Sequence, residues 1–425
     1  MNPRIAQIRT QAETELAGFL AARARLPAGA LAQARESAVA VFTNNGLPHR
    51  RVEAWHYTDL RNLMREAWPL AATPTPKIAA NDGLRVTIAD GACTGLPRLP
   101  PPGVTMRALR DVIAAGGDDL AAKLFPAIGA DDSIVALNAG LAQDGVVIEI
   151  ARGTEVAAPI EIEFISSDGA PRSDVSRSLV IVGDGATATV IETHTSNVRV
   201  QRNSALICRL GENASLDHVF VAAERAPDMH IASLIADVGG HATFQSFGFI
   251  AGGDVLRRQC FIRQSGEYAK IGLRGVSLLA GKQHADTTLV VDHAVPHGES
   301  RELFKHIVMD QASGVYQGKV IVRPHAQKTD GAMKSQALLL SDDAAMSNKP
   351  ELEIFADDVV CGHGATVAQI DDDQLFYLMS RGLPKAQAEG MLIEAFAREA
   401  IEFIANEALR ARCEAALGRW LEARG

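Results

Sequence analysis

The sharpest chemical feature of the sequence is a cysteine and a histidine two residues apart, Cys361 and His363, each followed by a glycine. In an extended strand such a pair lies on one face, so the thiol and the imidazole would point the same way. Iron–sulfur clusters take thiolate ligands and, less often, imidazole, and glycine lets a cluster or a second chain come close to the backbone. A buried cysteine in a glycine turn beside an exposed histidine is the alternative interpretation.

A second group of possible metal ligands lies between positions 284 and 306. Its members are imidazoles and carboxylates, which bind zinc and iron: His284, Asp286, Asp292, His293, His297, Glu299 and His306. His293 and His297 have the spacing of one helix face, but Pro296 between them would break that helix. Surface histidines, or histidines in hydrogen bonds between strands, are therefore the favoured interpretation.

Two glycine-containing segments have the composition of ligand loops but are interpreted as turns. Gly183–Ala186 precedes a strand pattern, whereas a dinucleotide site needs a helix N-terminus facing the phosphates. Ala326–Gly331 gathers a lysine, an amide and a carboxylate, but Thr-Asp-Gly is a strong turn signal. The sequence has no Gly-x-x-x-x-Gly-Lys-Ser/Thr loop, so no nucleotide is expected on this chain and any ATP dependence would come from another chain.

Composition limits the partners and the compartment. The 425 residues carry a formal charge of -9 and have a pI near 5.8, which argues against a general affinity for nucleic acid or anionic membranes. No apolar run approaches the roughly 20 residues that cross a bilayer, and Met1–Thr10 lacks the apolar core of a signal peptide. A cytoplasmic protein is expected, with five reduced and mostly buried cysteines, since these lie far apart in sequence.

The first part of the chain is expected to be helical. Spacings of three and four predict one helix that Pro27 interrupts, with an apolar stripe of Ile5, Ile8, Ala12, Leu16, Phe19 and Leu20. A second helix is predicted from Ala30 to Phe42, ending at an Asn-Asn-Gly turn. Thr73–Pro76 is a stiff connector because each proline fixes its own backbone, so we expect an amino-terminal domain over 1–78.

Between Leu84 and Val322 the apolar period changes from 3.6 to 2, which predicts a long all-β region. A Gly-x-x-Ala frame recurs in it at intervals of 28, 28 and 27 residues, starting at Gly183, Gly211, Gly239 and Gly266. Such a period is typical of a β-solenoid, whose coils bury their apolar faces against one another. We expect one continuous β-helix with Ala186, Ala214 and Ala242 stacked on successive coils; a β-sandwich with regular hairpins is the alternative.

The helical period returns after Asp371. The acidic run Asp371–Asp373 suits a helix start, Gly382 a helix end, and Pro384 the opening of a second helix. That second helix is expected to carry Leu392, Phe396 and Phe403, and a last Arg-rich helix reaches Trp420. The expected domains are therefore 1–78, a β-helix core over 79–365, and carboxy-terminal helices over 366–425.

Seven segments together resemble the SufB/SufD family of iron–sulfur assembly scaffolds: Arg51–Leu60, Ala326–Gly331, Lys349–Ile354, Ala356–Val359, Cys361–Thr366, Asp373–Leu378 and Ser380–Gly382. The resemblance touches both ends of the chain and its core. It implies a mainly β fold, a right-handed parallel β-helix between helical domains. The Cys-x-His-Gly-Ala-Thr form, the Trp-x-Tyr-Thr element and the length are nearer to the SufD branch than to SufB. Gly362 is a mild departure, since serine often stands at that place in relatives.

The resemblance implies a scaffold subunit and not an enzyme. Cys361 and His363 fall on SufD positions at the interface with SufB, where a transient iron–sulfur cluster forms, so both are candidate ligands. The implied partners are SufB, through the β-helix core, and the ATPase SufC, through the carboxy-terminal helices; the isolated chain could also pair as a homodimer. Two alternatives stay open: a β-helix carbohydrate-active enzyme, which needs a groove lined with carboxylates and basic residues, and a structural homodimer without a cluster role.

Overall fold

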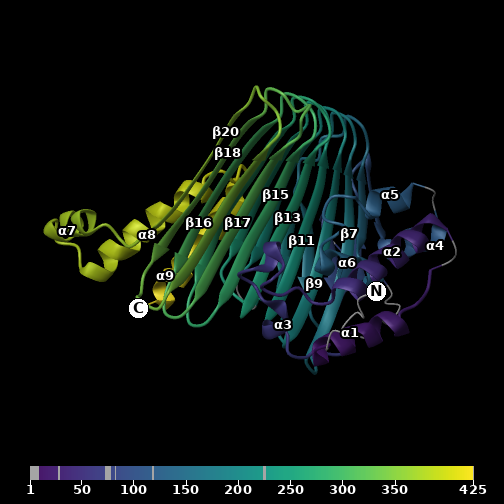
Figure 1. The fold of residues 1–425 in the computed structure, drawn as a ribbon, viewed down its shortest axis with the longest axis horizontal. Coiled ribbons are helices and arrows are strands. Elements are labelled where there is room, and N and C mark those ends of the chain that lie inside the picture. The colour runs from purple at the N-terminus through teal and green to yellow at the C-terminus, as the bar shows by residue number, and fades with distance from the viewer. Residues whose placement is uncertain are drawn as a thin grey trace, which may run out of the picture.

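A computed structural model describes residues 9–26, 29–71, 78–81, 83–116, 119–223 and 226–424. Strands make up 41% of the structure and helices 25%, so the protein is mainly β. Figure 1 shows helices of the amino-terminal part at one end of a β-solenoid and helix α7 projecting from the other end. The predicted break at Pro27 and the predicted connector Thr73–Pro76 lie outside the described residues. No described helix is long and apolar enough to span a membrane.

The solenoid has about eight turns, and its strands alternate between two sheets. In the described residues, the long sheet runs in the order β1 (Ala79–Asn81), β3 (Ala92–Pro97), β2 (Arg85–Ala89), β6 (Ile160–Ile165), β8 (Thr187–His194), β10 (Ser215–Ala222), β12 (Thr243–Ile250), β14 (Lys270–Leu279), β16 (Glu299–Val308), β18 (Asp330–Leu339) and β20 (Val360–Ala368). The short sheet runs in the order β19 (Ala345–Ile354), β17 (Ser313–Val322), β15 (His284–His293), β13 (Val255–Gln264), β11 (Met229–Val238), β9 (Val200–Leu210), β7 (Arg172–Val182), β5 (Val146–Ile150) and β4 (Val104–Ala108). From β5 and β6 onward, neighbouring strands in each sheet are parallel.

The repeat behind the solenoid prediction is confirmed at the corners of the coils. Thr187, Ser215, Thr243 and Lys270 are partners on successive strands. The alanines just before them are at most 1% exposed and stack in register: Ala186, Ala214, Ala242 and Ala269. The residue before each alanine has positive φ, which ordinarily favours glycine, yet two of these positions hold His241 and Tyr268. Their rings stack 5.0 Å apart, a contact that helps to offset the backbone cost.

The prediction of one continuous β-helix from Leu84 to Val322 is wrong in its first part. Helices α4 (Leu109–Ala115), α5 (Leu120–Leu124) and α6 (Ser133–Leu141) interrupt it there. The coils continue past Val322 as far as β20, close to the end of the core expected over 79–365. Every residue of α6 is buried, because the helix lies between α2 and the outer face of β7 and β9. A helix that is buried all round shows no one-sided apolar stripe, so no helical period marked it in the sequence.

The amino-terminal helices form where the sequence predicted them. Helix α1 (Gln11–Ala22) opens with a capping box of Thr10 and Glu13, and it buries three positions of the predicted stripe, Ala12, Leu16 and Leu20. Helix α2 (Ala30–Asn45) ends at Gly46, which has φ +67°. A short 3-10 helix, η1 (Glu53–Trp55), and α3 (Leu60–Leu63) follow. This part of the chain packs on α6 and the short sheet.

The carboxy-terminal helices begin as expected. Asp371 caps α7 (Asp372–Ser380) by accepting from the backbone N–H of Gln374, and Pro384 precedes α8 (Lys385–Ile401). Helices α8 and α9 (Glu407–Ala423) cover the outer face of the long sheet, where Ile393 packs in one cluster with Val276 and Ile307. Phe403 lies beyond α8 and not within it as predicted. Helix α7 buries none of its residues and extends away from the solenoid (Figure 1).

Candidate functional site

Strand β20 carries Cys361 and His363 and forms the last strand of the long sheet. It pairs on one side with β18, where Gly331 is the partner of Cys361 and Met333 the partner of His363. In the described residues no strand covers its other edge, nor the outer edge of β19 in the short sheet. The last coil therefore leaves backbone donors and acceptors of both sheets without strand partners, a surface suited to pairing with another chain.

The extended conformation expected for the Cys-x-His pair is present. The Cys361 side chain is half-buried against the core, and burial raises the pKa of its thiol. His363 is exposed, and a side-chain carbon added at Gly362 or Gly364 would meet nothing within 4 Å. The pair thus lies on one face of an open strand with free space around its glycines; its role as a ligand pair stays a prediction.

Large apolar side chains surround this end of the solenoid. Ile354 and Phe355 at the end of β19 are 39% and 59% exposed, and Val360 and Val367 on β20 are 72% and 47% exposed. Exposed apolar residues beside unpaired strand edges are typical of interaction surfaces. We call this surface, with Cys361 and His363, the terminal coil face.

Behind the terminal coil face the solenoid interior becomes polar. Ser300 and Glu302 on β16 occupy the interior rows that lead to Cys361 and His363, two strands further on. Glu302 is 3% exposed, and burial raises its pKa to about 8. Tyr316 on β17 is fully buried. Sequence reasoning missed these residues, because Arg301 and Glu302 are both charged and nothing in the pattern shows which of them points inward.

The histidine group between 284 and 306 does not converge on a metal site. No set of three or more His, Cys, Asp or Glu side chains in the described residues could hold a metal ion. The hydrogen-bond interpretation is right for His293, whose Nδ1 lies 2.9 Å from Oε1 of its strand partner Gln264. The surface interpretation is wrong for His293 and His306, which are 0% and 1% exposed. His284 bonds Thr58 at 2.9 Å, and His297 stacks on Tyr268.

Both glycine-containing segments are turns, as predicted. Gly183–Ala186 connects β7 to β8, and Ala326–Gly331 leads into β18. Lys328, with φ +63°, donates its backbone N–H to the carbonyl of Asp358 and forms an ion pair with the carboxylate of the same residue. This contact ties the turn to the segment just before β20. The turn therefore supports the strand that carries the Cys-x-His pair.

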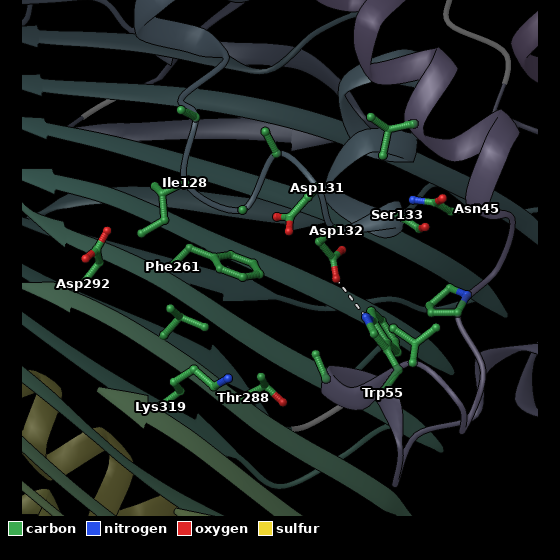
Figure 2. Close-up of a pocket in the computed structure, with 18 of the residues that line it drawn as sticks. Asn45, Trp55, Ile128, Asp131, Asp132, Ser133, Phe261, Thr288, Asp292 and Lys319 are labelled. Carbon is green, nitrogen blue, oxygen red and sulfur yellow. Dashed lines mark hydrogen bonds between the residues drawn. The ribbon is translucent and has the colours of Figure 1, made fainter. Parts of the chain in front are cut away.

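A cavity of about 960 Å³ lies between the amino-terminal part of the chain and the outer face of the short sheet (Figure 2). Carboxylates and basic residues line it, as the carbohydrate-active alternative requires. Two of its three carboxylates, Asp132 and Asp292, are already engaged, however. Asp132 caps α6 and accepts from Trp55 Nε1 at 2.8 Å, and Asp292 accepts from the Arg323 Nε at 2.7 Å and from Nη2 at 3.2 Å. This geometry favours a structural seam over a pair of free catalytic acids.

The seam explains the amino-terminal signature around Trp55. The Arg257 guanidinium lies 3.8 Å from the centroid of the Trp55 ring, and Arg257 Nη2 donates to the carbonyl of Ala54 at 2.8 Å. Arg257 also pairs with buried Asp286. The signature therefore joins the amino-terminal part to strands β13 and β15.

We expect Trp55→Ala to destabilise the protein by about 3–5 kcal/mol, since the side chain is 1% exposed and holds this seam. Urea unfolding of the purified chain measures the loss. Trp68→Ala is the matched control, because Trp68 is only part-buried and its Nε1 bonds the exposed Glu66. Equal stability of the two variants would contradict the structural role of Trp55.

Comparisons with known proteins identify the family of this chain. The family model described as "SUF system FeS cluster assembly, SufBD core domain" matches residues 164–396, and "SufBD protein N-terminal region" matches 23–82 and 94–162. The iron–sulfur cluster assembly protein SufD of Escherichia coli is 33% identical over 88% of this chain and 90% of its own length. A SufBD family protein of Synechocystis sp. is 30% identical over 90% and 89%, and SufD of Bacillus subtilis is 27% identical over 67% of each chain.

Proposed function

The chain belongs to the SufB/SufD family of iron–sulfur cluster assembly proteins, and we propose that it acts there as a SufD-type scaffold subunit without enzymatic activity of its own. In this proposal it forms a complex with SufB and the ATPase SufC and supplies part of a transient iron–sulfur cluster site. Its location in the cytoplasm stays a prediction from the sequence.

The observation that carries the proposal is the open terminal coil face with Cys361 and His363 on its last strand. A cluster commonly takes about four protein ligands. This strand offers one thiol and one imidazole, and the other cysteines, Cys93, Cys208, Cys260 and Cys413, are buried. A second scaffold that covers the face would supply the remaining ligands, which is the arrangement proposed with SufB. Without it, the same strand edges would pair with a second copy of this chain.

The ATPase is proposed to bind at the carboxy-terminal helices. Helix α7 exposes Phe376, Tyr377 and Met379 by 74%, 57% and 42%, and Met391 on α8 is 45% exposed. An amphipathic helix that buries nothing within its own chain is suited to a partner groove. ATP hydrolysis on the partner would then move α7 and α8, and α8 is packed on β14 and β16 of the solenoid. The movement would reach the terminal coil face through the long sheet.

Partner binding at the terminal coil face is tested by Val367→Glu. A charge placed in the centre of a dry interface costs several kcal/mol, so we expect SufB co-purification to fall by more than about tenfold. Leu99→Glu is the control, because Leu99 is 87% exposed in the loop between β3 and β4 and should leave binding unchanged. Undiminished SufB binding by Val367→Glu would place the interface elsewhere.

A further inference from the structure

Four buried side chains near the carboxy-terminal end of the solenoid lack a well-formed hydrogen bond. In the described part of the chain, Ser300, Glu302, His306 and Tyr316 are the buried polar side chains with no polar side-chain atom in such a bond. The hydroxyl of Ser300 and the carboxylate of Glu302 are nevertheless close enough to interact with each other. All four are at most 3% exposed, and all come from two strands, β16 and β17. An unpartnered buried polar group costs about 1–3 kcal/mol, so proteins retain such groups mainly where they serve a function.

Gly331 has no side chain, and it leaves a gap between Ser300 of this polar group and Cys361. The row runs Ser300, Gly331, Cys361 on strands β16, β18 and β20. A Cβ atom at Gly331 would lie 3.5 Å from Cys361 Sγ and 3.5 Å from Ser300 Oγ. One small atom or ion in that position would therefore face the Cys361 thiol and the Ser300 hydroxyl, with Val320 Cγ1 at 3.7 Å as the third neighbour. In the next row Met333 fills the corresponding place between Glu302 and His363.

The donors around the gap suit a divalent transition metal. Thiolate, carboxylate and hydroxyl groups form bonds of about 2.0–2.4 Å to such ions, so Sγ and Oγ would each need to move by about 1.3 Å. In a dry interior, one M²⁺ with one thiolate and one carboxylate is electrically neutral, which avoids burying net charge. Binding would release the thiol and carboxyl protons to solvent.

We propose that Cys361, Glu302 and Ser300 hold a single Fe(II) ion inside the last coils, on the interior side of Cys361. The site rests on the proposed function, since it places iron directly beneath the terminal coil face. It differs from the proposed cluster site at the SufB interface because His363 is not one of its ligands. Met333 lies between His363 and Glu302. It would let this chain hold one iron ion before a partner covers the face.

Titration of the purified, isolated chain with Co(II) and with Fe(II) under anaerobic conditions tests the site. We expect one ion per chain and, with Co(II), a thiolate-to-cobalt absorption band in the near ultraviolet. Glu302→Gln should weaken binding by more than about tenfold, and Cys361→Ser should remove the band. His363→Ala and Glu299→Gln should bind normally; Glu299 is the matched control because it lies on the same strand and its side chain is 43% exposed.

Gly331→Ala provides a second variant that does not alter a donor. Its φ is not positive and the added methyl group makes only ordinary contacts, so the protein should fold while the methyl fills the gap and blocks the metal. Absence of a bound ion in the wild-type chain, or full binding by either Gly331→Ala or Glu302→Gln, would overturn the proposal. Failure of SufB or SufC to co-purify would instead count against the proposed function, because the metal titration uses this chain alone.

Discussion

Replacing His363 with alanine is expected to leave the three-protein complex assembled and its ATPase active, while reducing its cluster content by more than about tenfold. The physical reason is that an exposed imidazole on an open strand has nothing within the chain to stabilise, so its loss removes a ligand and little else. Iron and acid-labile sulfide content and visible absorbance of the anaerobically purified complex measure the effect.

His241→Ala is the matched control, because His241 is also exposed but lies at a coil corner in a ring stack. It should leave the cluster content unchanged. A full cluster yield with His363→Ala, in a complex that is intact, would rule out an essential ligand role for His363.

Serine at both Phe376 and Met379 is expected to abolish co-purification of the ATPase. These side chains are exposed on a helix that buries nothing, so the change removes apolar contact area from the proposed interface without disturbing the core. A pull-down with the SufC partner measures the loss. Leu63→Ser, which changes an exposed apolar residue far from α7 in the sequence, should bind normally. Undiminished ATPase binding by the double variant would move the docking site off α7.

Deletion of Pro384–Gly425 is a less direct test of the same docking site. Helices α8 and α9 cover Val276, Leu278 and Ile307 on the outer face of the long sheet, so that deletion would expose a hydrophobic cluster. Substitutions on α7 avoid this effect, and they separate loss of the docking surface from loss of the fold.

Local signals in the sequence were enough to predict the solenoid and its helical ends. The alanines of the Gly-x-x-Ala frame are small because each coil corner leaves no room for a larger side chain, and Asp371 caps a helix that begins at the next residue. Helix α6 escaped prediction because burial on all sides removes the one-sided apolar pattern. The terminal strand β20, in contrast, lies almost wholly within the β-helix core expected over 79–365.

The sequence was enough to predict that Cys361 and His363 form a pair on one strand face. It was not enough to predict the exposed surface on which the pair lies. The spacing of Cys361 and His363 predicts one strand face, but their open edge depends on which strand ends the sheet, a property of the whole fold. Ser300 and Glu302 lie 61 residues before Cys361 and His363, respectively, and only the register of the coils brings each pair into one interior row. Likewise Trp55 meets Asp132 through packing that no local pattern encodes.

The most direct test of a cluster shared between this chain and SufB is to label only this chain with ¹⁵N-histidine in the assembled complex. Pulsed electron paramagnetic resonance of the reduced cluster then detects any nitrogen bonded to iron. We expect one ¹⁵N hyperfine coupling that disappears with His363→Ala and persists with His241→Ala. A complex whose cluster shows no coupling to nitrogen of this chain would contradict the assignment of His363 as a ligand.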